Sequence, residues 1–387
     1  MLERLFGTKR AYFDYASTTP LDKRVFKAMK PFISRAFANA SSLYKEGVEV
    51  RKAIEEARKK VAQVLQSKPE EIIFISGGTE GNNIAILGTY FHHKNVLKKE
   101  KIHFVTTSIE HSSVIEVFEH IRSLGAKVTY VSPEEDGIVS AKKIEEAFRP
   151  ETVLVSVQYA NNEIGTIQPI REIGKTIKEG IVFHVDACQA GAYLSLLVHD
   201  LHVDFLTLDG SKIYGPKGSG ILYKKRTAQL VPIIFGGGQE SGVRSGTENA
   251  AAIVGFAEAL NIADKEKHEE SKRLRMLRDR MIKELLGKIK NLRLNGDIAK
   301  RLPNNINICL PGLDAEYTVL RLDALGFAIS SVTSCKNISE DSSSYVMEEL
   351  YKNDSCAKSS LRITLGRFTT ENEAGRFMKA LLTVLVG

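Results

Sequence analysis

Six short apolar runs alternate with helical stretches between residues 101 and 225, and this alternation constrains the fold more than any other feature. The runs are KIHFVTTS, AKVTYVS, TVLVSVQYA, GIVFHVDA, VDFLTLDG and GILYKK. They are rich in Val, Ile, Leu and Phe without polar alternation, which is typical of parallel strands buried on both faces. The pattern therefore predicts an α/β fold with a large, doubly wound, mostly parallel sheet.

Two of these runs end beside groups of opposite charge. The run 181–185 is followed by Asp186, and the run 203–208 ends near Lys212. Ligands of open parallel sheets bind beyond the carboxyl ends of the strands, so both groups are expected at one edge. A carboxylate facing a ring nitrogen and an amine capturing an aldehyde is the arrangement that pyridoxal phosphate requires. The alternative is a helix-capping Asp and a surface Lys beside a turn.

A second candidate site follows the strand predicted at residues 71–76. The glycine-rich SGGTEGNN (residues 76–83) contains Gly78 and precedes a helix expected to begin near Thr79. Free N–H groups and the helix dipole at such a turn favour an anion such as phosphate. The segment has neither the Walker A pattern nor the GxGxxG dinucleotide fingerprint. A plain tight turn is the alternative.

Several polar residues lie at or just past predicted strand ends. Because they gather at one edge of the sheet, they are stronger candidates for active-site residues together than any one of them is alone. They are His111, Asn162, Glu163, Asp186, Gln189 and Lys212.

The remaining chain predicts a second, smaller α/β domain. Residues 250–289 read as one long helix that links the domains, and strand-like and helical segments alternate again to a final helix beginning at Glu371. We expect an N-terminal arm at 1–20 associated with the small domain, a large cofactor-binding domain at 21–255 and a small domain at 256–387. Within the latter, residues 330–358 are rich in Ser, Asn and acid, which favours a mobile loop that exposes Cys335.

Composition excludes several function classes. Four cysteines in 387 residues, with no CxxC pair, argue against a disulfide framework and a zinc site, so free thiols and no metal are expected. Cys309 in particular reads as a buried small hydrophobe. No apolar run is long enough to span a bilayer and no signal peptide is evident, so the cytoplasm is the default location. A net charge of +7 without a basic, aromatic-interleaved module predicts no direct nucleic-acid binding.

Nine motifs in order give a specific resemblance over nearly the whole chain. They are DYASTTP, SGGTEGNN, EHSSV, NNEIG, HVDACQ, GSKIYGPKG, RSGT, SSVTSC and SLRITLGRFTTENE. This series resembles the pyridoxal-phosphate-dependent cysteine desulfurases of the iron-sulfur-cluster-assembly type, within the class V aminotransferase superfamily of fold type I.

The resemblance implies roles for the residues at the strand ends. Lys212 would hold the cofactor covalently and move the proton at Cα, while Asp186 would pair with the pyridinium nitrogen. His111 would stack on the cofactor ring and relay protons. Gln189 and Asn162 would form hydrogen bonds on the side of the cofactor that carries its phenolic oxygen.

It also implies roles for the phosphate and substrate groups. Phosphate binding falls to Gly78, Thr79, Ser211 and, from the second subunit of a homodimer, Thr247. Arg362, assisted by Asn39, would bind the carboxylate of L-cysteine. Cys335 would take the sulfur as a persulfide and carry it to an acceptor or iron-sulfur scaffold protein, for cluster assembly or tRNA thiolation.

One departure bears on the cofactor. The family usually has Ser-Gly-His-Lys where this chain has Asp209-Gly210-Ser211-Lys212, and a carboxylate at 209 opposes a phosphate dianion unless it turns away. Two alternatives therefore stay open. One is a related lyase or transaminase that acts on selenocysteine or cysteine sulfinate, and the other is a degenerate, non-catalytic scaffold.

Overall fold

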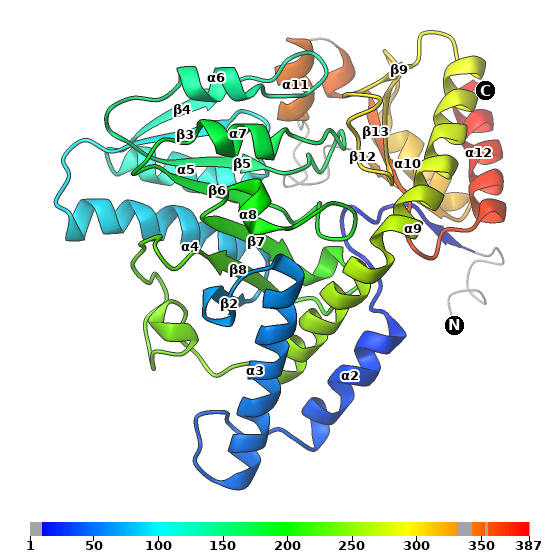
Figure 1. Ribbon diagram of the computed structural model, residues 1–387. Coiled ribbons are helices and arrows are strands. Elements are labelled where there is room, and N and C mark those ends of the chain that lie inside the picture. Colours follow the sequence, from blue (N-terminus) through cyan, green and yellow to red (C-terminus); the bar gives the residue numbers. More distant parts are fainter. Residues whose placement is uncertain (1–9, 332–342, 353–354, 387) are drawn as a thin grey trace.

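The computed structural model describes residues 10–331, 343–352 and 355–386, and a seven-stranded sheet forms its larger part (Figure 1). The strand order is β2-β8-β7-β6-β5-β3-β4. Their bounds are β2 Ile72–Ile75, β3 His103–Thr107, β4 Lys127–Val131, β5 Thr152–Gln158, β6 Val182–Asp186, β7 Phe205–Asp209 and β8 Gly220–Lys224. All neighbouring pairs are parallel except those of β8, which runs antiparallel to β2 and β7. The predicted α/β, mostly parallel sheet is confirmed.

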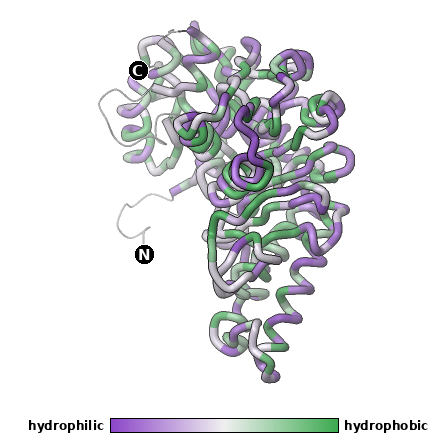
Figure 2. The backbone as a smooth tube through the Cα atoms, turned by 90° about the vertical axis from the view of Figure 1, so that its left-hand side faces the viewer, coloured by the Kyte–Doolittle hydropathy of each residue, from purple (hydrophilic) through white to green (hydrophobic). Residues whose placement is uncertain are grey.

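Helices cover both faces of this sheet. Successive strand residues point to opposite sides, so Leu154 and Val155 belong to two different apolar clusters. One face packs on α4 (Gly78–Phe91) and α5 (Ser112–Ser123). The other packs on α3 (Lys45–Leu65), α6 (Ala141–Glu146), α7 (Ile170–Thr176), α8 (Val198–Leu201) and the first half of α9. Figure 2 shows the stacked strands as largely hydrophobic segments inside the molecule.

A single 39-residue helix, α9 (Ala250–Lys288), runs from the large sheet to the small one (Figure 1). Phe256 and Leu260 lie in the core of the large sheet, whereas Leu274 and Met281 pack against the small sheet. That sheet is antiparallel with the order β12-β13-β10-β9, formed by β9 Arg293–Leu294, β10 Asn305–Cys309, β12 Ser330–Ser331 and β13 Ser360–Thr364. The helices α10 (Ala315–Ala324) and α12 (Glu371–Val386) pack on it, whereas α11 (Tyr345–Tyr351) packs on Ile109 and Ile164.

The segment from residue 11 to residue 19, which we call the arm, contacts both parts of the molecule. Its strand β1 (Ala11–Tyr12) pairs in parallel with β11 (Phe327–Ala328) of the small part. The N–H of Thr19 donates to the carbonyl of Ser211 beside the large sheet at 2.8 Å. The helix that follows, α2 (Lys23–Ser34), packs on α9.

The expectation of free thiols is wrong for two cysteines, because Cys309 and Cys356 form a disulfide with Cα atoms 5.4 Å apart. Cys309 ends β10 and lies opposite Ser360 of β13, and a 3₁₀ turn at Ser355–Ala357 returns Cys356 to the same place. The pair is separated by 47 residues in sequence, so no local spacing signals it. Cys188 is the free cysteine among the described residues, and Cys335 lies outside them.

Two further observations concern the described part of the chain. None of its helices combines the length and the apolar character that a membrane crossing requires. In the same residues no group of three or more His, Cys, Asp or Glu side chains is placed to hold a metal ion.

Candidate active site

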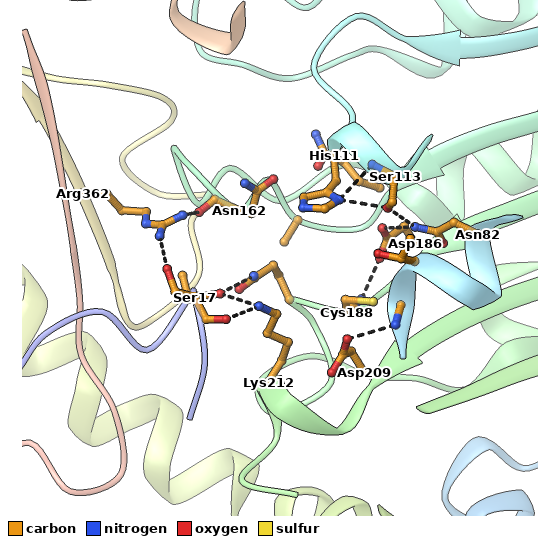
Figure 3. A pocket seen from close by; sticks show the side chains of 16 residues that line it. Ser17, Asn82, His111, Ser113, Asn162, Asp186, Cys188, Asp209, Lys212 and Arg362 are labelled. Carbon is orange, nitrogen blue, oxygen red and sulfur yellow. Dashed lines mark hydrogen bonds between the residues drawn. The ribbon is translucent and has the colours of Figure 1, made fainter. Parts of the chain in front are cut away.

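A cavity of about 260 Å³ opens where the arm and the small sheet meet the carboxyl ends of the large sheet's strands (Figure 3). Strands β5, β6 and β7 are parallel, so their carboxyl ends share one edge. Most of the predicted site residues line this cavity: Gly78, Thr79, His111, Asn162, Asp186, Gln189, Lys212 and Arg362.

Asp186 ends β6 and is 8% exposed. One carboxylate oxygen accepts a hydrogen bond from the side-chain amide of Asn82 at 2.8 Å, and the other accepts from the N–H of Cys188 at 3.0 Å. Asn82 is itself held by the hydroxyl of Ser113 at 2.9 Å. These bonds fix the direction of the carboxylate inside the cavity.

His111 lies at the N-terminus of α5 and faces the same space (Figure 3). Its Nδ1 accepts from the N–H of Ser113 at 3.1 Å. Burial lowers the pKa of the imidazole, so the ring is neutral at pH 7. Because Nδ1 is the acceptor, the neutral ring carries its proton on Nε2.

Lys212 follows β7 through a short 3₁₀ turn at Gly210–Lys212. Its amine donates to the backbone carbonyls of Ala16, at 3.0 Å, and of Ser17. Gln189 also donates to the carbonyl of Ala16, at 2.9 Å. The arm therefore holds the amine by neutral carbonyl oxygens.

Arg362 brings a guanidinium from β13 of the small sheet into the cavity while remaining only 3% exposed. It donates to the carbonyl of Asn162 at 3.0 Å, to a carboxylate oxygen of Asp14 at 3.0 Å and to the hydroxyl of Ser17 at 2.6 Å. Its Nε is buried without a hydrogen-bond partner among the described residues.

Asp209 ends β7 at the other side of the cavity (Figure 3). Its Oδ2 accepts from the N–H of Gly78 at 2.9 Å, and its Oδ1 accepts from the N–H of Ser211 at 2.7 Å. The glycine-rich turn predicted to bind an anion thus already faces a carboxylate of the chain itself.

Four predicted site residues are not brought to this cavity in the described chain. Asn39 is exposed, and its side chain caps the N–H of Ser41 at 2.9 Å. Ser211 lies beside Asp209 but does not line the cavity. Thr247 lines a separate cavity with Arg244 and is expected to act on the partner subunit. Cys335 falls outside the described residues.

Sequence reasoning also missed functional neighbours of the predicted residues. Asn82 is fully buried in the apolar helix α4, and a buried amide within the run GNNIAI is the signal that could have identified it. Asp14 and Ser17 had no such signal, because only the fold brings the arm to Arg362.

The donors and acceptors in the cavity fit the ring of a pyridoxal cofactor. Asp186, His111 and Lys212 supply the carboxylate, the flat ring and the amine that such a ring needs. The side-chain oxygens of Asn82 and Asn162 and the Nε of Arg362 are buried without a hydrogen-bond partner in the ranges described, which leaves polar groups for a ligand to satisfy. At the phosphate end, Asp209 already takes one of the first-turn amides of α4.

Comparison with known protein families gives one match over almost the whole chain. Residues 11–377 match the family described as Aminotransferase class-V.

Similar sequences and structures agree with this match. The chain is 42% identical over 374 residues to the cysteine desulfurase IscS 1 of Archaeoglobus fulgidus, covering 97% of this chain and 96% of that protein. It is 40% identical over 378 residues to the cysteine desulfurase IscS of Dictyoglomus turgidum, covering 97% and 95%.

Two solved structures share its architecture. A NifS-like protein superposes with a TM-score of 0.90 at 32% identity, covering 98% of this chain and 100% of that chain. The protein SspA in complex with cysteine gives a TM-score of 0.80 at 35% identity, with 94% and 100% covered.

Proposed function

The chain belongs to the aminotransferase class-V family and within it is a cysteine desulfurase, and we propose that it uses pyridoxal phosphate to move the sulfur of L-cysteine onto Cys335. The observation that carries this proposal is the meeting of Asp186, His111, Lys212 and Arg362 in one cavity. The carboxylate suits the ring nitrogen of the cofactor and the amine suits its aldehyde. The buried guanidinium suits the carboxylate of an amino acid.

The large sheet's residues serve the cofactor. When bound, pyridoxal phosphate supplies an electron sink for the electrons released at the substrate Cα. Asp186 would pair with the pyridinium nitrogen, because Asn82 and the Cys188 amide keep its carboxylate fixed in direction. Lys212, whose amine donates to the arm's carbonyls in this structure, would hold the cofactor and would take the Cα proton of the substrate. His111 would donate from Nε2, because the Ser113 N–H holds its Nδ1 as an acceptor.

The small sheet's residue serves the substrate. Arg362 exchanges its bond to Asp14 for the carboxylate of cysteine, and the planar fork then binds both oxygens. The Cys335 thiolate attacks the cysteine sulfur, so the carbon–sulfur bond breaks and a sulfur–sulfur bond forms. The carbon fragment would take up a proton at Cβ, regain one at Cα from Lys212, and leave as L-alanine.

The assembly and partners are also part of the proposal. We propose a cytoplasmic homodimer in which Thr247 of one subunit binds the cofactor phosphate of the other. Large apolar side chains exposed on α2 and the loop after it support an interface, since Ile33 is 57% and Phe37 is 79% exposed. The persulfide passes to an acceptor or iron-sulfur scaffold protein, for cluster assembly or tRNA thiolation.

One observation favours a second candidate. The bond between Asp209 and the Gly78 amide suits a degenerate member that has lost its cofactor and acts as a scaffold. The two functions differ in whether purified protein incubated with pyridoxal phosphate acquires the absorbance of a lysine-bound cofactor.

The test of the desulfurase is to measure sulfide and alanine formed from L-cysteine with pyridoxal phosphate present. The wild-type protein should release both in equal amounts under reducing conditions, and Cys335→Ala should abolish sulfide release. Ser339→Ala, in the same segment, is the matched control and should keep wild-type turnover. Unimpaired turnover by Cys335→Ala would assign the chemistry to a lyase or transaminase that needs no sulfur-carrying thiol.

A further inference from the structure

The N-terminus of α4 is capped by a side chain from a different strand. The capping position, Gly77, has no side chain to offer the first-turn amides. Asp209 of β7, which is 131 residues away from Gly78 in sequence, accepts the Gly78 N–H with one oxygen and the Ser211 N–H with the other. A carboxylate at this position is stabilised by the helix dipole in the same way as a bound phosphate would be.

The other charged groups around this helix end already have hydrogen-bond partners. Glu80, also in the first turn of α4, accepts from the N–H of Ser76 and from Arg244, each at 2.8 Å. The amine of Lys212 is held by the arm. The remaining titratable groups that line the cavity on this side are His111, which burial keeps neutral, Asp186 and Cys188. The anion end of the cavity is therefore not left with an excess of positive charge.

The space next to the two glycines of this turn is also limited. A methyl group built on Gly78 would lie 2.6 Å from the Sγ of Cys188, and one built on Gly77 would lie 3.1 Å from the Oδ2 of Asp209. A phosphate oxygen can reach the Gly78 N–H only if the Asp209 carboxylate turns away from it.

We propose that Asp209 is the residue that sets the cofactor's phosphate affinity in this chain, by competing with the phosphate for the Gly78 amide. This inference rests on the proposed cofactor. The competition weakens binding of pyridoxal phosphate but not of pyridoxal, which lacks the phosphate. The competition becomes stronger as the phosphate passes from one negative charge to two, around pH 6. The loss of affinity for pyridoxal phosphate is therefore larger at pH 8 than at pH 5.5.

The test is an equilibrium titration of cofactor-free protein with pyridoxal phosphate and with pyridoxal, each at pH 5.5 and pH 8, followed by dialysis and by absorbance. Asp209→Ser should bind pyridoxal phosphate about 10-fold or more tightly than the wild type at pH 8, with a smaller gain at pH 5.5. Its affinity for pyridoxal should equal that of the wild type.

A second variant guards against misfolding. Asp209→Asn keeps a side-chain oxygen for the Gly78 amide while removing the charge, so it should show part of the same gain. The matched control is Asp204→Asn, which removes a carboxylate that pairs with Lys225 outside the cavity, just before the same strand. It should leave the affinities for both compounds unchanged.

The outcomes separate this inference from the function on which it rests. Equal or weaker binding of pyridoxal phosphate by both Asp209 variants overturns the inference, as does an equal gain for pyridoxal, and in both cases the desulfurase stands. No binding of either compound by any of the proteins overturns the inference together with the cofactor assignment.

Discussion

The two sheets contribute to the cavity in different ways. The large sheet supplies residues from the ends of strands and the starts of helices. These residues are far apart in sequence but lie at one edge of the sheet, as Asp186 and Lys212 do. The small sheet supplies Arg362 from the middle of β13, an interior strand that pairs with β10 and β12. A disulfide joins the end of β10 to the turn before β13. We propose that the large sheet holds the cofactor and that the small sheet binds the substrate carboxylate.

Removing the amine of the large sheet should have the largest effect. Lys212→Ala should lower sulfide release at least about 10³-fold, because no other amine lines the cavity in the described chain. Steady-state sulfide release measures this, and borohydride reduction should no longer fix cofactor to the protein. The exposed Lys217, which also lies between β7 and β8, is the control, and Lys217→Ala should behave as the wild type. Turnover by Lys212→Ala within tenfold of the wild type would contradict the assignment of the catalytic amine to the large sheet.

Disrupting the small sheet's contribution should change binding rather than chemistry. Arg362→Ala should raise KM for L-cysteine about 100-fold with little change in kcat, since two charge-assisted hydrogen bonds of about 1.5 kcal/mol each are lost. Arg362→Lys should recover part of the loss because it keeps the charge without the fork. Arg293→Ala removes an exposed Arg from the same sheet and should leave KM unchanged. A fall in kcat at unchanged KM would place Arg362 in the chemistry instead.

The disulfide should make the small part the redox-sensitive one. Reducing Cys309–Cys356 removes the crosslink of a loop of 47 residues and should lower the free energy of unfolding by about 4 kcal/mol in the loop-entropy account. Urea unfolding with and without dithiothreitol measures the change. The Cys309→Ala, Cys356→Ala double variant should not respond to the reductant. If dithiothreitol shifts the wild type and the double variant equally, the effect belongs to another group.

Stability of the large part should depend on pH through Glu110. Burial raises the pKa of this carboxyl from 4.5 to about 8, and the charge of Asp186 adds to the rise. The unfolded chain loses this proton near pH 4.5, whereas the folded chain keeps it to about pH 8. Its stabilising contribution is therefore complete below pH 4.5 and is lost as the pH rises to 8, with a slope of about 1.4 kcal/mol per pH unit.

The substitution Glu110→Gln tests this, because the amide imitates the protonated acid. The pH slope of the free energy of unfolding between pH 5 and pH 8 should become smaller by about 1 kcal/mol per unit. Urea unfolding at each pH provides the measurement, and the exposed Glu116→Gln on α5 is the control. An unchanged slope in Glu110→Gln would show that other groups control the pH dependence.

The sequence predicted the large sheet and its site better than the small one, for a physical reason. Asp186 and Lys212 follow buried strands, and parallel strands leave their ends at one edge, so local pattern places both residues. The expectations for Asn39 and Ser211 came from resemblance alone, and neither lines the cavity.

The contacts that escaped prediction depend on chain segments that only the fold brings together. Asp14 meets Arg362 across 348 residues, and Cys309 meets Cys356 across a loop whose spacing carries no signal. Asp209 was noted as an unfavourable neighbour of a phosphate, but its bond to the Gly78 amide required the structure.

The arm has a consequence for how the site is assembled during synthesis. Its first strand pairs with residues 327 and 328, and Asp14 bridges to Thr364, so it cannot dock until almost the whole chain has left the ribosome. Closing so long a loop is also slow. The nascent large sheet therefore lacks the carbonyls of Ala16 and Ser17 that accept from the Lys212 amine in the folded chain.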